Sequence, residues 1–159
     1  MKAIQVQSHG GPEVLKMTTL PDPEPGAGEV SVRIKASALN PLDSIVRMGY
    51  FPIAKKPPLI LGEEASGIVE RDAAGFKAGE RVIVYGGGLG VFRDGAWAEL
   101  VAVPASSLRR LPEGISFEEG AALANVGVTA YGALRWPSRC KRSRVGRGPM
   151  WSSTLLGVR

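Results

Sequence analysis

The sequence has very few residues of the kinds that bind metals through sulfur or imidazole. Its 159 residues include one cysteine, Cys140, and one histidine, His9. A single cysteine cannot form a disulfide within the chain, and a structural zinc site needs several cysteine ligands. The sequence therefore predicts no metal site and a reducing compartment, which we expect to be the cytoplasm.

Long hydrophobic runs are also missing. The N-terminal segment MKAIQVQ alternates in polarity and lacks the apolar core of a signal peptide, and no apolar run is long enough to span a bilayer. We therefore expect no membrane partner. Hydrophobic residues make up 44% of the chain, as in globular proteins, and the 21 glycines and 12 prolines favour a turn-rich, mainly β fold.

The net charge of +5 comes entirely from the C-terminal segment, and the rest of the chain has no positive net charge. Residues 137–159 hold six basic and no acidic residues, which leaves 14 basic against 15 acidic residues over 1–136. The body of the chain thus has no basic surface typical of a nucleic-acid partner. The basic segment also lacks aromatic interleaving and an amphipathic pattern, so a polyanion-binding tail is the weaker interpretation.

The most informative stretch runs from Glu29 to Gly49. Residues 29–36 alternate in polarity and predict a strand with one buried face. Asn40 precedes Pro41, which disfavours helical geometry at Asn40 and ends the strand at a corner. Asp43 follows, and Asp43–Met48 predicts a short helical turn that favours an Asp43–Arg47 ion pair. Two interpretations stay open: a functional site at this corner, or a turn that Asp43 caps.

Further elements follow from local patterns. Strands are expected over 2–6, 14–17, 80–85 and 97–103, and the loop Gly86–Gly90 matches neither a dinucleotide nor a phosphate-binding fingerprint. Ser116 and Glu119 form a capping box, so a helix should begin there. Glu63 and Glu64 are neighbours on a predicted strand and should face opposite sides, with one of them solvated or paired with a cation.

Three adjoining segments resemble the medium-chain dehydrogenase/reductase superfamily, and within it the zinc-independent quinone oxidoreductase branch. They are HGGPEVLKM, LPDPEPGAGEVSVRIKASALNPLDSIVRMGYFP and PPLILGEEASGIVE, and the similarity covers about the first 135 residues. The resemblance implies a GroES-like, partly open β-barrel with short helices. It implies hydride transfer from NADPH to a quinone or another activated double bond, without zinc.

The resemblance also implies roles for individual residues. Asn40 and Thr129 would lie near the nicotinamide, and Asp43 and Arg47 would lie at the catalytic cleft. Tyr50 would line the same cleft, because this chain has isoleucine at position 45, where relatives carry a tyrosine.

This chain does not have the zinc ligands of the zinc-dependent relatives. Those relatives carry a cysteine at the position that matches Asn40 and a histidine at the position that matches Glu63. The resemblance therefore implies a site without catalytic zinc.

The resemblance divides the chain unevenly. Residues 1–124 would form the N-terminal GroES-like domain and 125–136 a helix or hinge toward a cofactor domain. Residues 137–159 change composition and hold no dinucleotide-binding fingerprint, so we interpret them as an out-of-frame or disordered ending. We therefore expect the chain alone to bind NADPH weakly, and we expect an exposed docking surface that favours a homodimer or aggregation. A non-enzymatic, partner-binding module is the alternative function.

Overall fold

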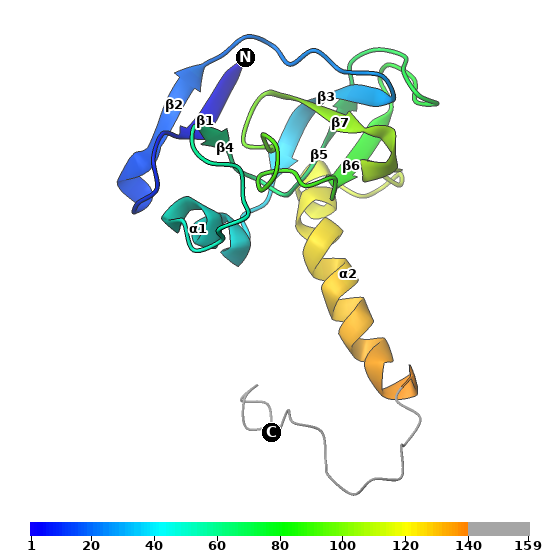
Figure 1. Ribbon diagram of the computed structural model, residues 1–159. Coiled ribbons are helices and arrows are strands. Elements are labelled where there is room, and N and C mark those ends of the chain that lie inside the picture. The colour runs from blue at the N-terminus through cyan, green and yellow to red at the C-terminus, as the bar shows by residue number, and fades with distance from the viewer. Residues whose placement is uncertain (140–159) are drawn as a thin grey trace, which may run out of the picture.

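The computed structural model describes residues 1–139, with side chains described for 1–134. Residues 1–139 form eight strands, two α-helices and two short 3-10 turns (Figure 1). The strands are β1 (Lys2–Val6), β2 (Leu15–Thr19), β3 (Glu29–Ser37), β4 (Leu59–Ile60), β5 (Glu64–Val69), β6 (Arg81–Tyr85), β7 (Leu100–Pro104) and β8 (Leu108–Arg110). The helices are α1 (Pro41–Met48) and α2 (Phe117–Arg139), and the 3-10 turns are Pro12–Val14 and Ala105–Ser107.

The strands form two antiparallel sheets. The larger sheet has the order β7-β3-β5-β6-β8 and curls into half a barrel, and the smaller one has the order β2-β1-β4. β1 and β2 pair from Lys2↔Thr19 to Val6↔Leu15, as the predicted hairpin requires. The mainly β, partly open barrel predicted from the sequence is confirmed.

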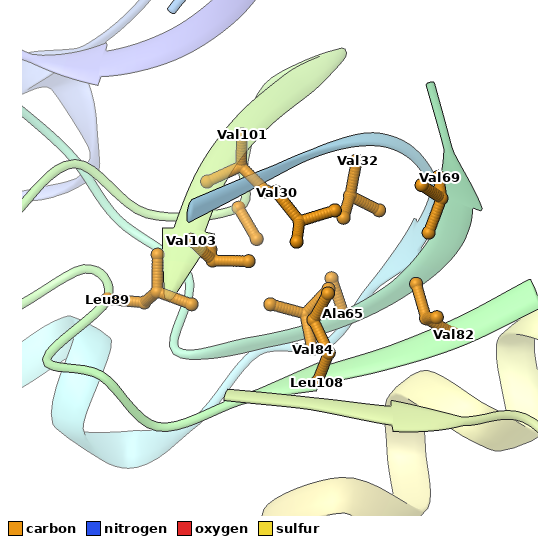
Figure 2. Close-up of a cluster of buried hydrophobic side chains, with 11 residues drawn as sticks. Val30, Val32, Ala65, Val69, Val82, Val84, Leu89, Val101, Val103 and Leu108 are labelled. Carbon is orange, nitrogen blue, oxygen red and sulfur yellow. The ribbon is translucent and has the colours of Figure 1, made fainter. Parts of the chain in front are cut away.

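The core lies inside the curled sheet, where valines from neighbouring strands point toward one another (Figure 2). Val30 and Val32 of β3 are fully buried, as the alternation of this strand predicts. Val82 and Val84 of β6 are also fully buried. β-branched side chains at every second position of β3 and β6 thus fill the inside of the curled sheet, in which β3 lies between β7 and β5.

Gly62 divides the segment 59–69 between the two sheets. Its φ is +101°, a conformation that other residues rarely adopt. A Cβ atom at this position would lie 2.5 Å from Cδ1 of Trp97, so only glycine fits. β4 therefore joins β1 in the smaller sheet, while β5 joins β3 and β6 in the larger one. This break places Glu63 and Glu64 at a junction between the sheets.

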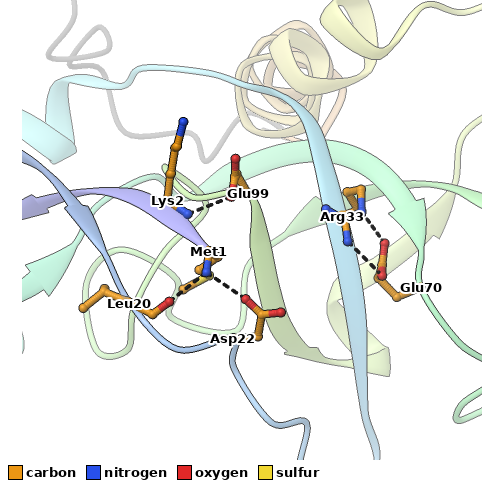
Figure 3. Close-up of polar contacts among 7 residues, drawn as sticks. All are labelled: Met1, Lys2, Leu20, Asp22, Arg33, Glu70 and Glu99. Atoms are coloured by element: carbon orange, nitrogen blue, oxygen red, sulfur yellow. Dashed lines mark hydrogen bonds and ion pairs between the residues drawn. The ribbon is translucent and has the colours of Figure 1, made fainter.

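The N-terminal amino group fixes the open end of the β1–β2 hairpin (Figure 3). It donates hydrogen bonds to the Leu20 carbonyl at 2.7 Å and to Oδ1 of Asp22 at 2.8 Å. The backbone N–H of Lys2 donates to Oε2 of Glu99 at 2.7 Å, next to β7. The Met1 contacts close the hairpin, and the Lys2–Glu99 contact links the smaller sheet to the segment that leads into β7.

Figure 3 also shows an ion pair on the larger sheet, between Arg33 of β3 and Glu70 just after β5. Nε and Nη2 of Arg33 donate to the two carboxylate oxygens of Glu70 at 2.5 and 3.1 Å. Both side chains are partly exposed, so the pair adds little to stability.

The two helices take different positions (Figure 1). α1 packs against the smaller sheet, where Val46 shares an apolar cluster with Val6 and Leu59. α2 begins at the predicted capping box, because Glu119 N–H donates to Oγ of Ser116 at 3.1 Å and Ser116 N–H donates to Oε2 of Glu119 at 2.8 Å. Its first turns pack on the larger sheet, and the rest projects away from it.

α2 is 23 residues long, so it exceeds the short helices expected from the sequence. Its last residues, 137–139, belong to the predicted basic ending, and residues 140–159 lie outside the described part of the chain. Neither described helix is long and apolar enough to cross a membrane.

Candidate functional site

The Asn-Pro corner between β3 and α1 is built around the carboxylate of Asp43. Asn40 is extended, with φ −120° and ψ 154°, as a residue before proline should be. Oδ2 of Asp43 accepts a hydrogen bond from Asn40 N–H at 2.8 Å, and Oδ1 accepts one from Gly62 N–H at 3.0 Å. Asp43 is 2% exposed. The predicted capping role of Asp43 is confirmed, and the same carboxylate ties α1 to the break at Gly62.

Glu64 joins this corner to α2, a role that the sequence did not indicate. Its side chain is fully buried. Oε1 accepts a hydrogen bond from Nδ2 of Asn40 at 2.8 Å, and Oε2 accepts one from the backbone N–H of Asn125. Glu63, which is half-buried, is therefore the member of the pair to which the prediction of a solvated or cation-paired glutamate can apply, because Glu64 is neither. α2 packs on β5 and buries this carboxylate against neutral N–H donors instead.

Glu63 lies beside this network and lines a cavity of about 240 Å³. It is half-buried, and its Oε1 is fully buried without a hydrogen-bond partner among the described residues. Asn125 and Tyr85 also line the cavity. The other walls are mostly apolar side chains from α1 and the loops around it: Leu42, Phe51, Leu89, Val91 and Phe92. Polar groups therefore meet an apolar cavity at this point, a combination typical of ligand sites.

The environment raises the pKa of two of these carboxyls. Burial raises the pKa of Glu63 above its ordinary value, and the negative charges of Asp43 and Glu64 raise it further. Burial also raises the pKa of Asp43, although the hydrogen bonds from Asn40 and Gly62 oppose that rise. Buried carboxyls with raised pKa values are frequent at functional sites.

Arg47 and Tyr50 lie at the far end of α1. Nη1 of Arg47 donates to the Gly10 carbonyl, and Gly10 N–H donates to the Arg47 carbonyl at 3.1 Å. The expected Asp43–Arg47 ion pair is wrong, because backbone N–H groups occupy both oxygens of Asp43. Tyr50 is 73% exposed and is not among the residues that line the Glu63 cavity. An eight-residue helix separates this end from Asn40 by about 12 Å.

Thr129 lies on the exposed part of α2. It follows Asn125 by four residues, which places it about 6 Å further along the helix. The structure thus brings Asn40 and Asp43 together, with Thr129 one turn beyond the Asn125–Glu64 contact and with Arg47 and Tyr50 apart from them.

The described residues offer only part of a site for a dinucleotide. The glycine-rich loop Gly86–Gly90 folds on itself, because the Gly88 carbonyl accepts hydrogen bonds from the N–H groups of Val91, Phe92 and Arg93. The chain then continues as a loop and not as a helix, so it lacks the helix N-terminus of a phosphate cradle. Among residues 1–139, no group of three or more His, Cys, Asp or Glu side chains could hold a metal ion.

Residues 26–113 match the alcohol dehydrogenase GroES-like domain. The chain is 40% identical over 137 residues to a quinone oxidoreductase of Pseudomonas aeruginosa, covering 84% of this chain and 40% of that protein. It is 36% identical over 137 residues to the mouse synaptic vesicle membrane protein VAT-1 homolog-like, covering 84% of this chain and 31% of that protein. The chain thus spans less than half the length of these relatives.

A solved structure has the same arrangement of elements. The Escherichia coli quinone oxidoreductase complexed with NADPH superposes with a TM-score of 0.76 and 34% identity, covering 86% of this chain and 41% of that one. The chain therefore belongs to the GroES-like domain family of alcohol dehydrogenases, in the quinone oxidoreductase branch of the medium-chain dehydrogenase/reductase superfamily.

Proposed function

We propose that this chain forms the N-terminal catalytic part of an NADPH-dependent quinone oxidoreductase. The reaction is hydride transfer from NADPH to a quinone or another activated double bond. The observation that carries the proposal is the apolar cavity at Glu63, which lies directly beside the Asn40–Glu64–Asn125 network. The name of the Pseudomonas aeruginosa relative and the NADPH-bound Escherichia coli structure support it.

The proposed site divides the work among residues of α1 and α2. Asp43 fixes the corner, and Asn40 and Thr129 lie toward the nicotinamide. The resemblance assigns Arg47 and Tyr50 to the hydride acceptor, although both lie outside the Glu63 cavity, at the other end of α1. NADPH supplies the hydride when bound, and the phosphate contacts belong to the part of the relatives that this chain does not span.

The proposal includes a metal-free site and a cytoplasmic location. Asn40 supports the first point, because its amide already donates to Glu64 and stands where zinc-dependent relatives have a cysteine ligand. The single cysteine supports a reducing compartment. The proposal also includes the division of the chain. Residues 1–124 form the domain and 125–136 link it to a cofactor domain, with the boundary inside α2.

NADPH binding and oxidation by the full chain test this proposal. Because the described residues lack a phosphate cradle, we expect calorimetry to show weak NADPH binding, and duroquinone to support slow NADPH oxidation. Thr129→Val should weaken NADPH binding by about fivefold, the value of one hydrogen bond, whereas Thr19→Val on β2 should change nothing. Micromolar NADPH binding, or equal binding by the Thr129 and Thr19 variants, would contradict the proposal.

A non-enzymatic, partner-binding module remains the alternative, because part of α2 exposes apolar side chains. Leu123, Val126, Val128 and Leu134 are 56 to 80% exposed. Exposed apolar patches mark interaction surfaces, and the same patch would also support a homodimer or aggregation. Sedimentation and an NADPH oxidation assay of the full chain together distinguish the two functions. A stable monomer that shows no duroquinone-dependent NADPH oxidation favours the module.

A further inference from the structure

β2 forms one edge of the smaller sheet, and its outer side is open. The sheet has the order β2-β1-β4, so within residues 1–139 no strand pairs with the side of β2 that faces away from β1. Figure 1 shows this strand at the outer margin of the fold. An open strand edge presents backbone N–H and C=O groups that another strand can bind. β2 therefore offers a surface for strand pairing.

The residues that flank β2 fix the phase of its hydrogen bonds. The Val14 carbonyl accepts a hydrogen bond from Gln7 N–H at 3.4 Å, and Leu20 N–H donates to the Met1 carbonyl at 2.9 Å. Hydrogen-bonded and non-hydrogen-bonded pairs alternate along an antiparallel ladder. The even-numbered residues of β2 therefore bond to β1, and the odd-numbered residues turn their backbone groups outward.

Three odd-numbered residues make up the open edge: Leu15, Met17 and Thr19. The N–H group of Leu15 already donates to the Pro12 carbonyl. The N–H groups of Met17 and Thr19 have no hydrogen-bond acceptor within residues 1–139. Both residues are exposed, and Met17 is exposed to 70%. Two donors and three carbonyls on this edge are therefore accessible to another strand.

The other outer strands of the two sheets are protected. β8 is three residues long, and the Ala102 carbonyl of β7 accepts a hydrogen bond from Nη2 of Arg93 at 3.0 Å. β4 is covered by the loop before β7, because Gly95 N–H donates to the Ile60 carbonyl at 2.8 Å. Natural proteins shorten or cover strand edges in these ways to prevent pairing. β2 has five residues without a proline or a bulge, and its one charged residue is Lys16.

The sequence of β2 fits a second copy of itself in antiparallel register. When Met17 lies opposite Met17 of the second copy, Leu15 lies opposite Thr19 and Lys16 lies opposite Thr18. The positive charge of each strand then faces a threonine and not another lysine, so the pair avoids like charges directly opposite each other. In this register the free N–H groups of Met17 and Thr19 meet the outward carbonyls of Met17 and Leu15 in the other copy.

An apolar surface beside the edge favours the same pairing. Met17 lies opposite Ile4 of β1, which is 37% exposed. Both residues line an open cavity of about 330 Å³, together with Ile34 and Trp97. Two paired β2 strands place both Met17 side chains on one face of the joined sheet, next to Ile4 of each copy. Cross-strand apolar pairs of this kind stabilise a sheet and remove apolar surface from water.

We infer that β2 is a self-association surface, through which two copies of this chain join their smaller sheets into one continuous sheet across a two-fold axis. The interface is isologous, because the same strand forms both sides of it. It differs from the exposed apolar part of α2, which continues a helix packed on the larger sheet. The inference goes beyond the proposed function and does not depend on it.

Amide hydrogen exchange of the full chain at low and high protein concentration tests the register. We expect the amides of Met17 and Thr19 to exchange about tenfold more slowly at the high concentration, because each gains an acceptor in the second copy. The amides of Lys16 and Thr18 already bond to β1 and should change little. A chain that stays monomeric up to about 1 mM, or one that associates with unchanged exchange at Met17 and Thr19, would overturn the inference.

Sedimentation equilibrium of three variants locates the interface. Met17→Lys places two like charges opposite each other at the two-fold axis and should weaken the dimer at least about tenfold. Met48→Lys, at a methionine of α1 that is 37% exposed, should leave the dimer unchanged, as should Val128→Lys on α2. Thermal unfolding checks that each variant is folded. Association that Val128→Lys abolishes and Met17→Lys leaves intact would place the interface on α2 and contradict the inference.

Discussion

Asp43 shows how one residue holds the candidate site together. Its two oxygens accept backbone hydrogen bonds from Asn40 and Gly62, which belong to different parts of the chain. A carboxylate is suited to this position because it offers acceptors on both sides and no donor. The geometry of the corner therefore depends on a group that the family resemblance assigned to catalysis.

The substitution Asp43→Asn tests this structural role. An asparagine has one acceptor oxygen, so its NH₂ group must face one of two backbone N–H donors. We expect the free energy of unfolding to fall by about 1–3 kcal/mol, the cost of a buried unsatisfied group. Urea denaturation measures the change. Asp72→Asn, in an exposed pair with Lys77, is the matched control and should lose less. Equal losses in the two variants would contradict the account.

At the scale of secondary structure, α2 combines a packed beginning with a projecting end. A Cβ atom on Gly120 would lie 2.7 Å from Cδ1 of Leu111 and 3.4 Å from Cβ of Ser66. A Cβ atom on Gly132 would meet nothing within 4 Å. Gly120 therefore lies in a close contact and Gly132 does not, although both glycines weaken the helix.

Alanine substitutions separate these two cases. Gly132→Ala should stabilise the distal part of α2 by up to about 1 kcal/mol, because alanine is the better helix former. Gly120→Ala should gain less stability than Gly132→Ala, because the new methyl group requires the Leu111 side chain to shift. Amide hydrogen exchange along α2 measures the first effect and thermal unfolding the second. An equal gain from the two substitutions would contradict the close contact of Gly120 with Leu111.

Local patterns predicted those elements that depend on near neighbours in the sequence. Alternation identified β3, and the Ser116–Glu119 capping box located the start of α2. The sequence failed where the partner is distant. Arg47 contacts Gly10, 37 residues away, and Glu64 meets Asn125, 61 residues away. No periodicity could show that α2 covers Glu64, because helix placement depends on tertiary packing. The available sequence signal for Glu64 was the polar pair Glu63–Glu64, which follows Gly62 directly.

At the scale of the whole described chain, residues 1–139 form a GroES-like half-barrel from which a long helix projects (Figure 1). The relatives reported above are more than twice as long as the matched part of this chain. The exposed apolar side chains belong to α2, and the cavity lined by Glu63 also contacts α2 through Asn125. Under the proposed function, joining a cofactor domain to α2 should raise NADPH oxidation above that of the chain alone.

A chimera tests this central claim most directly. Residues 1–134 replace the matching N-terminal part of the Escherichia coli quinone oxidoreductase, and NADPH oxidation by duroquinone is measured beside the parent enzyme. Our account predicts quinone-dependent NADPH oxidation, reduced by Tyr50→Phe and unchanged by Thr19→Val. A chimera that folds and binds NADPH but leaves duroquinone unreduced would contradict the claim that this chain carries the acceptor side of a quinone oxidoreductase.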